Sequence, residues 1–274
     1  MRVLLSVYHW LAYYLSFALF GLFGLLLNLG SLVLGWLPAT ARAERFFQRL
    51  IHQHFRLWFW WLSFARIVLV RFTGRPAAAA GRGAVVVANH PGLMDATYLL
   101  ARFPHAVCVF KPAIRRNPVL GAAARRAGYV ASDAGHDSLR AAAGKVAAGH
   151  VLIMFPEGTR SRGDTLLPFK PGFALVARIA QAPVQLVRIT SEAPLLAKGL
   201  PWWRIPPLPV QVTVAFGPAL PPPTPAQKTR EFVAEVERWF REPVGRPATT
   251  PASTRVPALA ASGQPEAPRW QTVP

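Results

Sequence analysis

A histidine and an aspartate lie five residues apart where an apolar stretch of the sequence ends. Residues 85–88 are Val-Val-Val-Ala, Asn89 and His90 follow, and the dipeptide Pro-Gly comes next. An apolar, β-branched run that ends in Pro-Gly predicts a strand followed by a turn. Histidine is the side chain best suited to move a proton near neutral pH, and Asp95 is close enough to orient it. A His and an Asp at this spacing also occur by chance, so the pair needs support from the rest of the chain.

A second apolar run also leads directly into polar residues. Residues 151–155 are Val-Leu-Ile-Met-Phe, and Pro-Glu-Gly-Thr-Arg-Ser follows at 156–161. The planar guanidinium of Arg160 suits a phosphate group, and Gly158 would let a ligand approach the backbone. Glu157 would fix Arg160 or hold a substrate hydroxyl. The stretch predicts a binding turn at a strand end, and a surface turn with an ion pair is the alternative.

A third candidate is the basic segment that follows the apolar run 106–110. It holds Lys111, Arg115 and Arg116 before a helix that we expect to begin near Pro118. Basic residues around a helix N-terminus form a natural anion site, because the helix dipole and the free N–H groups both favour negative charge. A solvated basic loop is the simpler interpretation of this segment taken alone.

These candidates require strands and helices that bring them together. Apolar runs and turn residues predict strands at 85–88, 106–110, 128–131, 151–155, 184–189 and 210–216. They predict helices at 94–101, 118–127, 137–148, 173–180 and 225–241. Strands and helices that alternate in this way indicate an α/β fold with a mostly parallel central sheet flanked by helices. Strand ends meet at one edge of such a sheet, which is where ligands bind.

The N-terminal segment is apolar over a length that could cross a bilayer. From residue 11 to 37 the only strongly polar residue is Asn28, and about 20 apolar residues suffice for a span. Tyrosine and tryptophan residues lie near its ends, as in the aromatic belts of membrane proteins. A signal peptide is the alternative, because residues 41–43, Ala-Arg-Ala, resemble a cleavage site. The apolar run is too long for a signal peptide, so we expect a retained membrane anchor.

The charges around this segment predict its orientation. One arginine, Arg2, precedes the apolar run, whereas Arg42, Arg45, Arg49 and Arg56 follow it. The positive-inside tendency places positively charged flanks in the cytoplasm. We therefore expect the protein at a bacterial-type inner membrane, with its catalytic domain facing the cytoplasm.

A second apolar stretch, residues 57–70, is interrupted by Arg66 and is short for a span. We expect an amphipathic helix at the membrane interface or the returning arm of a shallow hairpin, and a core helix of the globular domain is the alternative. The resulting division is 1–72 for the membrane anchor and interfacial helices, and 80–242 for the globular domain. The Pro- and Ala-rich residues 243–274 are expected to be disordered.

Composition limits the partners. The chain of 274 residues carries 31 Lys and Arg against 12 Asp and Glu, a formal net charge of +19. Such an excess indicates an anionic partner, which could be an anionic membrane, an acidic substrate or carrier, or nucleic acid. The basic residues are scattered and no nucleic-acid-binding motif is recognisable, so we expect no nucleic acid. The single cysteine, Cys108, excludes an internal disulfide and a multi-cysteine metal cluster.

Taken together, these residues resemble the glycerolipid acyltransferase family, which includes the 1-acylglycerol-3-phosphate acyltransferases. The Asn-His-x4-Asp block of that family is matched at residues 89–95. Its Phe-Pro-Glu-Gly-Thr-Arg-Ser block is matched in full at residues 155–161. Its Lys-x2-Leu-x3-Pro-x2-Gly block is matched at 111–121, with Ile in place of Leu, and a fourth, Val- and Pro-rich block loosely at 182–187. The resemblance covers about residues 80–220 and includes an N-terminal membrane segment.

The resemblance implies acyl transfer to the free hydroxyl of a lysophospholipid, with 1-acylglycerol-3-phosphate as the expected acceptor and phosphatidic acid as the product. It implies that His90 is the general base and that Asp95 orients it. The residues expected to bind the substrate are Asn89, Lys111, Glu157, Gly158, Thr159 and Arg160. Acyl-CoA or acyl-carrier protein would be the donor, at a membrane, with no other cofactor and no metal. The alternatives are an acyltransferase for another lyso-lipid, such as lyso-ornithine lipid, or a non-catalytic basic protein that binds membranes or nucleic acid.

Overall fold

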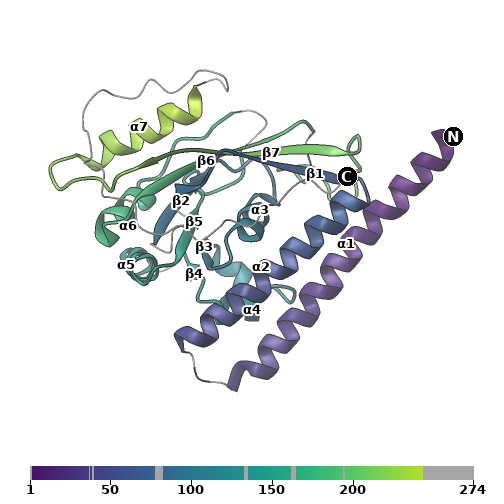
Figure 1. Ribbon diagram of the computed structural model, residues 1–274, viewed down its shortest axis with the longest axis horizontal. Helices are drawn as coiled ribbons and strands as arrows, with labels where there is room; N and C mark the ends of the chain where they lie inside the picture. Colours follow the sequence, from purple (N-terminus) through teal and green to yellow (C-terminus); the bar gives the residue numbers. More distant parts are fainter. Residues whose placement is uncertain are drawn as a thin grey trace, which may run out of the picture. The chain divides into compact units, whose positions relative to one another are not determined.

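The computed structural model of the protein is organised around a seven-stranded sheet (Figure 1). The structure describes residues 2–36, 38, 40–77, 83–132, 135–161, 165–193 and 195–242. The tail that is expected to be disordered, 243–274, lies outside the described residues. The strands are β1 (Val68–Thr73), β2 (Ala84–Ala88), β3 (Ala106–Phe110), β4 (Val130–Ala131), β5 (Val151–Met154), β6 (Val184–Ser191) and β7 (Val210–Leu220).

The strands lie in the order β1-β7-β6-β2-β5-β3-β4. Among the described strands, β6 and β7 pair antiparallel and the other neighbours pair parallel. The carboxyl ends of β2, β3, β5 and β6 therefore meet at one edge of the sheet. β7 runs in the opposite direction because it follows β6 without a crossover helix. The predicted α/β fold with a mostly parallel sheet is confirmed.

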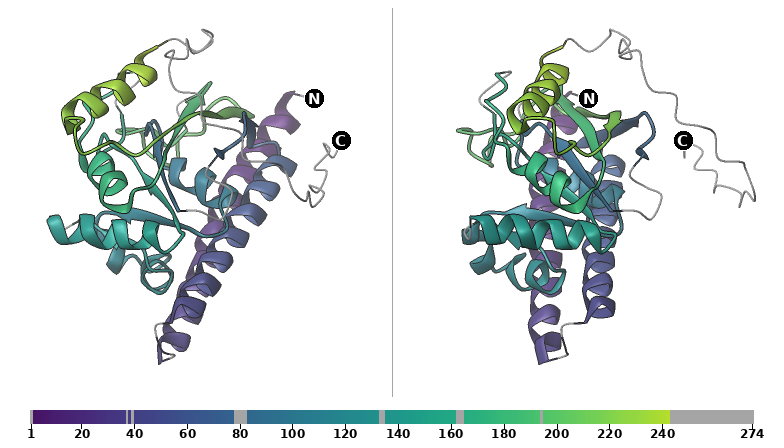
Figure 2. Two further views of the ribbon diagram at one scale, coloured as in Figure 1. Left: turned by 60° about the vertical axis from the view of Figure 1, so that its left-hand side comes forward. Right: turned by 90° about the vertical axis from the view of Figure 1, so that its left-hand side faces the viewer.

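Helices cover both faces of the sheet. They are α1 (Arg2–Val33), α2 (Ala41–Phe64), α3 (Asp95–Arg102), α4 (Gly121–Arg126), α5 (His136–Ala147), α6 (Gly172–Ala180) and α7 (Thr229–Arg241). The 3₁₀ helices that lie wholly in the described residues are η1 (Leu34–Trp36) and η3 (Pro112–Arg116). The helices α2, α3 and α4 lie on one face with α1 outside them, and α5, α6 and α7 lie on the other face (Figure 1, Figure 2).

β2 is buried on both faces, which explains why its sequence is a continuous apolar run. Val86 faces the core that α2 and α3 complete, whereas Val87 faces the core that α5, α6 and α7 complete. All five residues of the strand are buried. A parallel strand between two helical layers has no solvated side and therefore needs no polar alternation. This burial fixes the strand end from which His90 projects.

Strand β1 corrects one prediction. The sequence placed residues 57–70 in an interfacial helix or hairpin arm. Residues 57–64 are helical, but residues 68–70 belong to β1, which pairs parallel with β7 at the edge of the sheet. α2 ends at Phe64, and Arg66 takes a left-handed φ of 53° where the chain turns into the sheet. The partner strand lies near the other end of the domain sequence, so no local pattern indicates the pairing.

α2 is the core helix that the sequence left open as an alternative. Its buried side includes Phe47, Ile51, Phe55 and Leu62. Residues 1–242 form one compact unit, so the predicted division between 1–72 and 80–242 does not separate two bodies. The physical reason is that α2 and β1 supply part of the core and of the sheet that the later strands complete.

α1 is long and apolar enough to cross a membrane, by length and composition. It also makes contacts with the rest of the domain at several points along its length. The hydroxyls of Tyr13 and Tyr14 donate to the carbonyls of Trp202 and Trp203, both at 2.8 Å. Its exposed large apolar residues include Leu11, Leu15, Leu22, Leu25, Leu29 and Leu32. The helix thus contacts the domain on one side and presents apolar side chains on the other.

Asn28 corrects the anion site predicted at the helix near Pro118. The helix in question, α4, begins at Gly121. The Asn28 Oδ1 accepts from the N–H groups of Ala122 and Ala123, at 2.6 and 3.3 Å. An amide oxygen from α1 therefore occupies the free donors that an anion would need. The strongly polar residue of the apolar segment is a helix cap that fixes α1 to the domain.

Candidate active site

The turn after β2, residues 89–95, holds the predicted acid–base pair, and we call it the histidine turn. The Nδ1 atom of His90 lies 2.8 Å from Oδ2 of Asp95. The Gly92 N–H donates to the same oxygen at 2.7 Å. The side chain of His90 is 19% exposed and that of Asp95 is 4% exposed. The imidazole can therefore meet a substrate, whereas the carboxylate can act only through the imidazole.

Burial is the main influence on the Asp95 carboxyl. It raises the pKa of Asp95 above its ordinary value, and the hydrogen bonds from His90 and Gly92 oppose that rise. Loss of water disfavours the charged form of a carboxyl, whereas hydrogen-bond donors favour it. Because His90 uses Nδ1 for Asp95, Nε2 is the ring nitrogen left to exchange a proton. The pair has the arrangement of a general base and the group that orients it.

The turn after β5, residues 155–161, is the arginine turn. β5 pairs parallel with β2, so the two turns leave neighbouring strands at the same edge of the sheet. The Phe155 ring stacks on the His90 ring, with centroids 4.2 Å apart. The Ser161 N–H donates to the His90 carbonyl at 2.8 Å. The structure therefore brings the two motifs, which are far apart in sequence, into direct contact.

Glu157 ties the two turns together from inside. Its Oε1 accepts from the His90 N–H at 2.9 Å. Its Oε2 accepts from the Ser161 hydroxyl at 2.8 Å and from the Leu167 N–H at 3.0 Å. Only 3% of Glu157 is exposed. These contacts correct the prediction that Glu157 fixes Arg160 or holds a substrate hydroxyl, because both carboxylate oxygens are used inside the protein.

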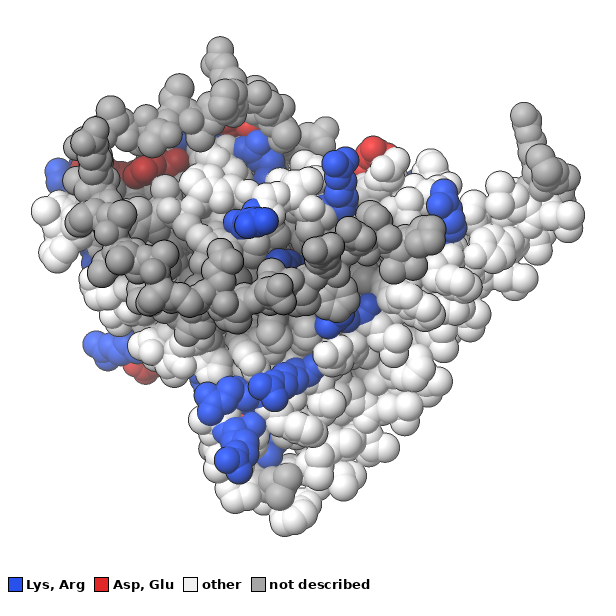
Figure 3. All heavy atoms as spheres, viewed as in Figure 1, with Lys and Arg blue, Asp and Glu red and all other residues white. Residues whose placement is uncertain are grey.

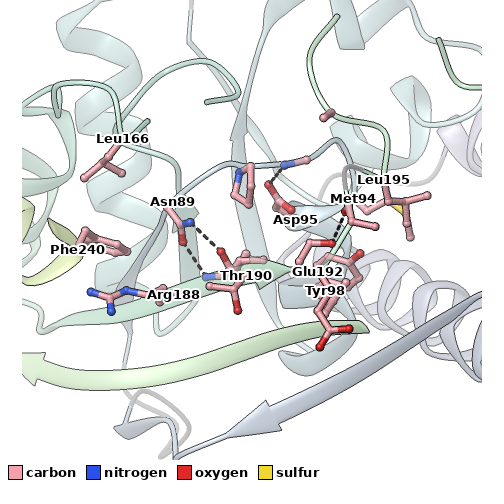
Figure 4. A pocket seen from close by; sticks show the side chains of 17 residues that line it. Asn89, Met94, Asp95, Tyr98, Leu166, Arg188, Thr190, Glu192, Leu195 and Phe240 are labelled. Carbon is pink, nitrogen blue, oxygen red and sulfur yellow. Dashed lines mark hydrogen bonds between the residues drawn. The ribbon is translucent and has the colours of Figure 1, made fainter. Parts of the chain in front are cut away.

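Asn89 is also occupied within the protein. Its Oδ1 accepts from the Ile189 N–H at 2.7 Å, and its Nδ2 donates to the Ile189 carbonyl at 2.8 Å (Figure 4). The side-chain amide thereby continues the pairing of β2 with β6 beyond the end of the strand. The amide is held by the backbone of β6, and Asn89 also lines the cavity beside the turn, so its role in substrate binding stays a prediction.

Gly158, Thr159 and Arg160 are the members of the predicted binding set in the arginine turn that reach the surface. Gly158 has a φ of 69°, which L side chains rarely adopt, and the Lys170 Nζ would lie 2.9 Å from a Cβ at this position. The Arg160 Nη1 donates to the Leu196 carbonyl at 2.9 Å. The sequence analysis missed Lys170, because its approach to Gly158 depends on the fold of the following segment and not on a local pattern.

Lys111 lies at the same edge of the sheet but away from this contact. It follows β3, which is the neighbour of β5, and its side chain is exposed. Within the described part of the chain, no side-chain hydrogen bond or ion pair joins Lys111 to either turn. The structure thus places Lys111 beside the candidate site without bringing it together with His90 or Arg160.

A cavity of about 410 Å³ borders the histidine turn (Figure 4). Figure 4 shows Met94, Tyr98 and Leu195 on one side of it and Arg188 and Phe240 on the other. The lining is therefore apolar with a few polar groups, as in most sites for small molecules. The lining includes Asp95 but not His90 or Arg160, so the cavity lies on the carboxylate side of the acid–base pair.

Residues 69–190 match the family model described as Acyltransferase, and this range contains both turns. We call residues 69–190 the acyltransferase domain, after the family model that they match. The resemblance predicted from the sequence blocks is therefore confirmed. Lys111 also lies within the acyltransferase domain, whereas α1, α2 and the loop between β6 and β7 lie outside the matched range.

Two curated relatives of the chain carry the same name. A 1-acyl-sn-glycerol-3-phosphate acyltransferase from Limnanthes douglasii is 32% identical over 136 residues, 47% of this chain and 48% of the relative. A protein of the same name from Helicobacter pylori is 32% identical over 108 residues, 37% of this chain and 46% of the relative. The chain thus spans about half the length of these curated relatives.

A solved structure is similar over a longer range. The crystal structure of the 1-acyl-sn-glycerophosphate (LPA) acyltransferase PlsC from Thermotoga maritima has a TM-score of 0.65 and 25% sequence identity. The similarity covers 88% of this chain and 95% of that chain. It therefore extends beyond the acyltransferase domain to elements that the family model does not match.

Proposed function

We propose that the protein transfers a fatty acyl group from a thioester to the free hydroxyl of 1-acylglycerol-3-phosphate, giving phosphatidic acid. The observation that carries the proposal is the 2.8 Å contact between His90 and Asp95 inside the acyltransferase domain. The names of the similar proteins support the choice of acceptor. Acyl-CoA or acyl-carrier protein is the proposed donor, since the reaction needs an activated acyl group.

His90 acts in this proposal as a general base. Its Nε2 takes the proton of the acceptor hydroxyl while the hydroxyl oxygen bonds to the thioester carbonyl carbon. Asp95 holds the opposite ring nitrogen and stabilises the imidazolium that forms. The tetrahedral intermediate then collapses, the C–S bond breaks, and the thiolate leaves with the proton returned by His90. Atoms and charges balance without a further reactant.

The acyl group passes directly between the two substrates in this scheme. Cys108 does not qualify as a nucleophile, because burial raises the pKa of its thiol to about 12. The Ser161 hydroxyl is buried and donates to Glu157. Both observations support attack by the acceptor hydroxyl and not by a side chain.

The arginine turn is the proposed phosphate end of the site. The Arg160 guanidinium has a geometry suited to phosphate oxygens, and Lys170 adds positive charge beside Gly158. The turn contacts His90 through Phe155. An acceptor held by its phosphate at this turn would present its hydroxyl to the imidazole, which is the positioning that direct acyl transfer requires.

Membrane attachment is part of the proposal, because both substrates carry acyl chains. The exposed apolar residues of α1 and the exposed rings of Trp202 and Trp203 suit a lipid surface. In Figure 3, Lys and Arg side chains border the uncharged surface along α1 and α2. Cations beside an apolar surface favour an anionic bilayer. The cytoplasmic side of an inner membrane is the proposed location, from the charge distribution around the apolar segment.

The test is acyl transfer by the full-length protein in mixed micelles, with a labelled acyl donor. Lysophosphatidate, lyso-ornithine lipid and lysophosphatidylglycerol are offered as acceptors, each with acyl-CoA and with acyl-carrier protein. We expect labelled phosphatidic acid, with at least about a tenfold preference for lysophosphatidate, the value of one well-placed charged contact. If only lyso-ornithine lipid is acylated efficiently, that lipid and not lysophosphatidate is the acceptor. If no acceptor is acylated, the proposal is contradicted.

A further inference from the structure

The loop between β6 and β7 reaches from the sheet edge to both turns. Leu195 and Leu196 are 7% and 8% exposed, which anchors the loop in the core. Ala197 forms a backbone bridge with Gly92 of the histidine turn. The loop lies outside the matched range 69–190 and outside the sequence blocks that indicated the family. Its contacts with both turns nevertheless make it part of the wall around the site.

Leu196 has a backbone conformation that residues other than glycine rarely adopt. Its φ is 52°, in the left-handed region. The carbonyl of this residue accepts the hydrogen bond from Arg160 at 2.9 Å. Non-glycine residues in such conformations collect at binding sites, where the surrounding structure over-determines them. The loop thus adopts a costly shape in the place where it holds the guanidinium of the arginine turn.

Lys198 extends from this loop to the arginine turn. Its Nζ donates to the Thr159 Oγ1 at 3.1 Å, and the side chain is exposed. Together with Arg160 and Lys170, it gives three cationic side chains around residues 158–160.

Among the residues that the structure describes, these three cations have no ion-pair partner. Glu157, the acidic residue of the turn, is buried and directed inward. A group of positive charges gathered at one turn attracts an anion.

We propose that Lys198 binds a substrate phosphate group together with Arg160 and Lys170. The inference rests on the proposed function, which supplies the phosphate. An ammonium group has three N–H donors, and the bond to Thr159 uses one of them, so two remain for phosphate oxygens. The headgroup of lysophosphatidate and the phosphates of acyl-CoA share this chemistry.

The experiment compares Lys198→Ala, Lys198→Arg and the control Lys228→Ala in the full-length protein. Lys228 is an exposed lysine directly before α7, away from both turns. The KM for lysophosphatidate and the KM for acyl-CoA are measured separately, with kcat. Equilibrium binding of lysophosphatidate is measured in micelles without a donor, so that binding is read independently of turnover.

Lys198→Ala should raise one KM by about five- to tenfold, the effect of one charged hydrogen bond at an exposed site, and leave kcat within about twofold. Lys198→Arg should restore most of the affinity, and Lys228→Ala should change neither constant. A rise in the KM for lysophosphatidate, with weaker binding in micelles, assigns the phosphate to the acceptor. A rise confined to the KM for acyl-CoA assigns it to the donor.

Unchanged KM values for both substrates in Lys198→Ala would overturn the inference while the proposed function stands. A second possible result is that the wild-type protein transfers no acyl group to any acceptor. In that case the proposed function fails, and binding of lysophosphatidate that still depends on Lys198 would support the phosphate site alone. Equal binding by the wild-type protein and Lys198→Ala would then overturn the site as well.

Discussion

The histidine turn and the arginine turn leave neighbouring parallel strands, but they distribute their polar side chains differently. In the histidine turn the reactive His90 is partly exposed and rests on a buried carboxylate. In the arginine turn the carboxylate of Glu157 is directed inward and holds the backbone N–H of His90, while Arg160 lies at the surface. A motif thus contains residues that meet a substrate and residues that only hold the turns together.

This comparison assigns different kinds of effect to residues that are adjacent in sequence. Substitutions of surface residues should change kinetic constants and leave stability almost unchanged. Substitution of the inward residue Glu157 should lower stability and activity together, because it releases the turn that carries His90.

The largest effect is expected at the reactive end of the histidine turn. His90→Ala removes the proposed proton acceptor, so kcat for acyl transfer to lysophosphatidate should fall by about a thousandfold. Thermal unfolding, measured on the same preparation, should show a midpoint close to that of the wild-type protein. His136→Ala, at the exposed start of α5, is the control and should retain full activity. Turnover near the wild-type level in His90→Ala would remove His90 from the mechanism.

Asp95→Asn should reduce kcat by about a hundredfold, because the imidazole loses the group that orients it and stabilises its charged form. The same substitution should not lower the stability of the folded protein. Burial raises the pKa of Asp95 in the folded protein above its value in the unfolded chain. The free energy of unfolding therefore decreases as the pH rises from the unfolded pKa to the folded pKa, because the carboxyl must ionise in a buried place. Above the folded pKa this loss of stability stays constant.

Near neutral pH, asparagine removes that cost, and the thermal midpoint of Asp95→Asn should not fall below that of the wild-type protein. Asp137→Asn, on the exposed side of α5, is the control for both readings. A variant that is strongly destabilised at neutral pH would show that the carboxylate holds the turn and does not only orient His90.

Glu157→Gln tests the inward side of the arginine turn. An amide places N–H donors opposite the Leu167 N–H or the His90 N–H, so we expect a loss of about 1–3 kcal/mol of folding free energy. The thermal midpoint should drop by roughly 2–4 °C for each kcal/mol, and kcat by about tenfold. Glu231→Gln, exposed in the first turn of α7, is the matched control. A change in the KM for lysophosphatidate with unaltered stability would instead place Glu157 against the substrate.

Arg160→Ala should have the smallest effect on chemistry. The KM for lysophosphatidate should rise by about tenfold, with kcat and the thermal midpoint close to wild type, because a surface cation is lost. Steady-state kinetics with varied acceptor concentration separates the two constants, and Arg230→Ala on α7 is the control. If the KM stays unchanged and the protein is destabilised, Arg160 is a structural tie to the β6–β7 loop and not a phosphate ligand.

The parts of the fold that follow from local patterns could be predicted from the sequence. The continuous apolar runs of β2, β3 and β5 indicated buried parallel strands, and the polar residues after them indicated a shared edge. The two complete sequence blocks indicated the family that the match to residues 69–190 confirms. The contact between the turns followed from the parallel pairing of neighbouring strands.

The remaining features depend on partners that are distant in sequence. β1 is a strand because β7 lies beside it, and Asn28 is a helix cap because α4 begins against α1. The direction of Glu157 depends on the backbone of His90, and the cationic group around Gly158 depends on Lys198 from a later loop. None of these contacts leaves a periodicity or a motif, so residue type alone suggested substrate binding for side chains that hold the structure together.

A double-mutant cycle of acyl transfer tests the central claim, that His90 and Asp95 act as one unit on the acceptor hydroxyl. The turnover of His90→Ala, Asp95→Asn and the double variant is measured with lysophosphatidate and acyl-CoA under saturating conditions. If Asp95 acts only through the imidazole, the double variant should be no slower than His90→Ala alone. A double variant slower by the product of the two single effects would show that the residues act independently, and it would contradict the account.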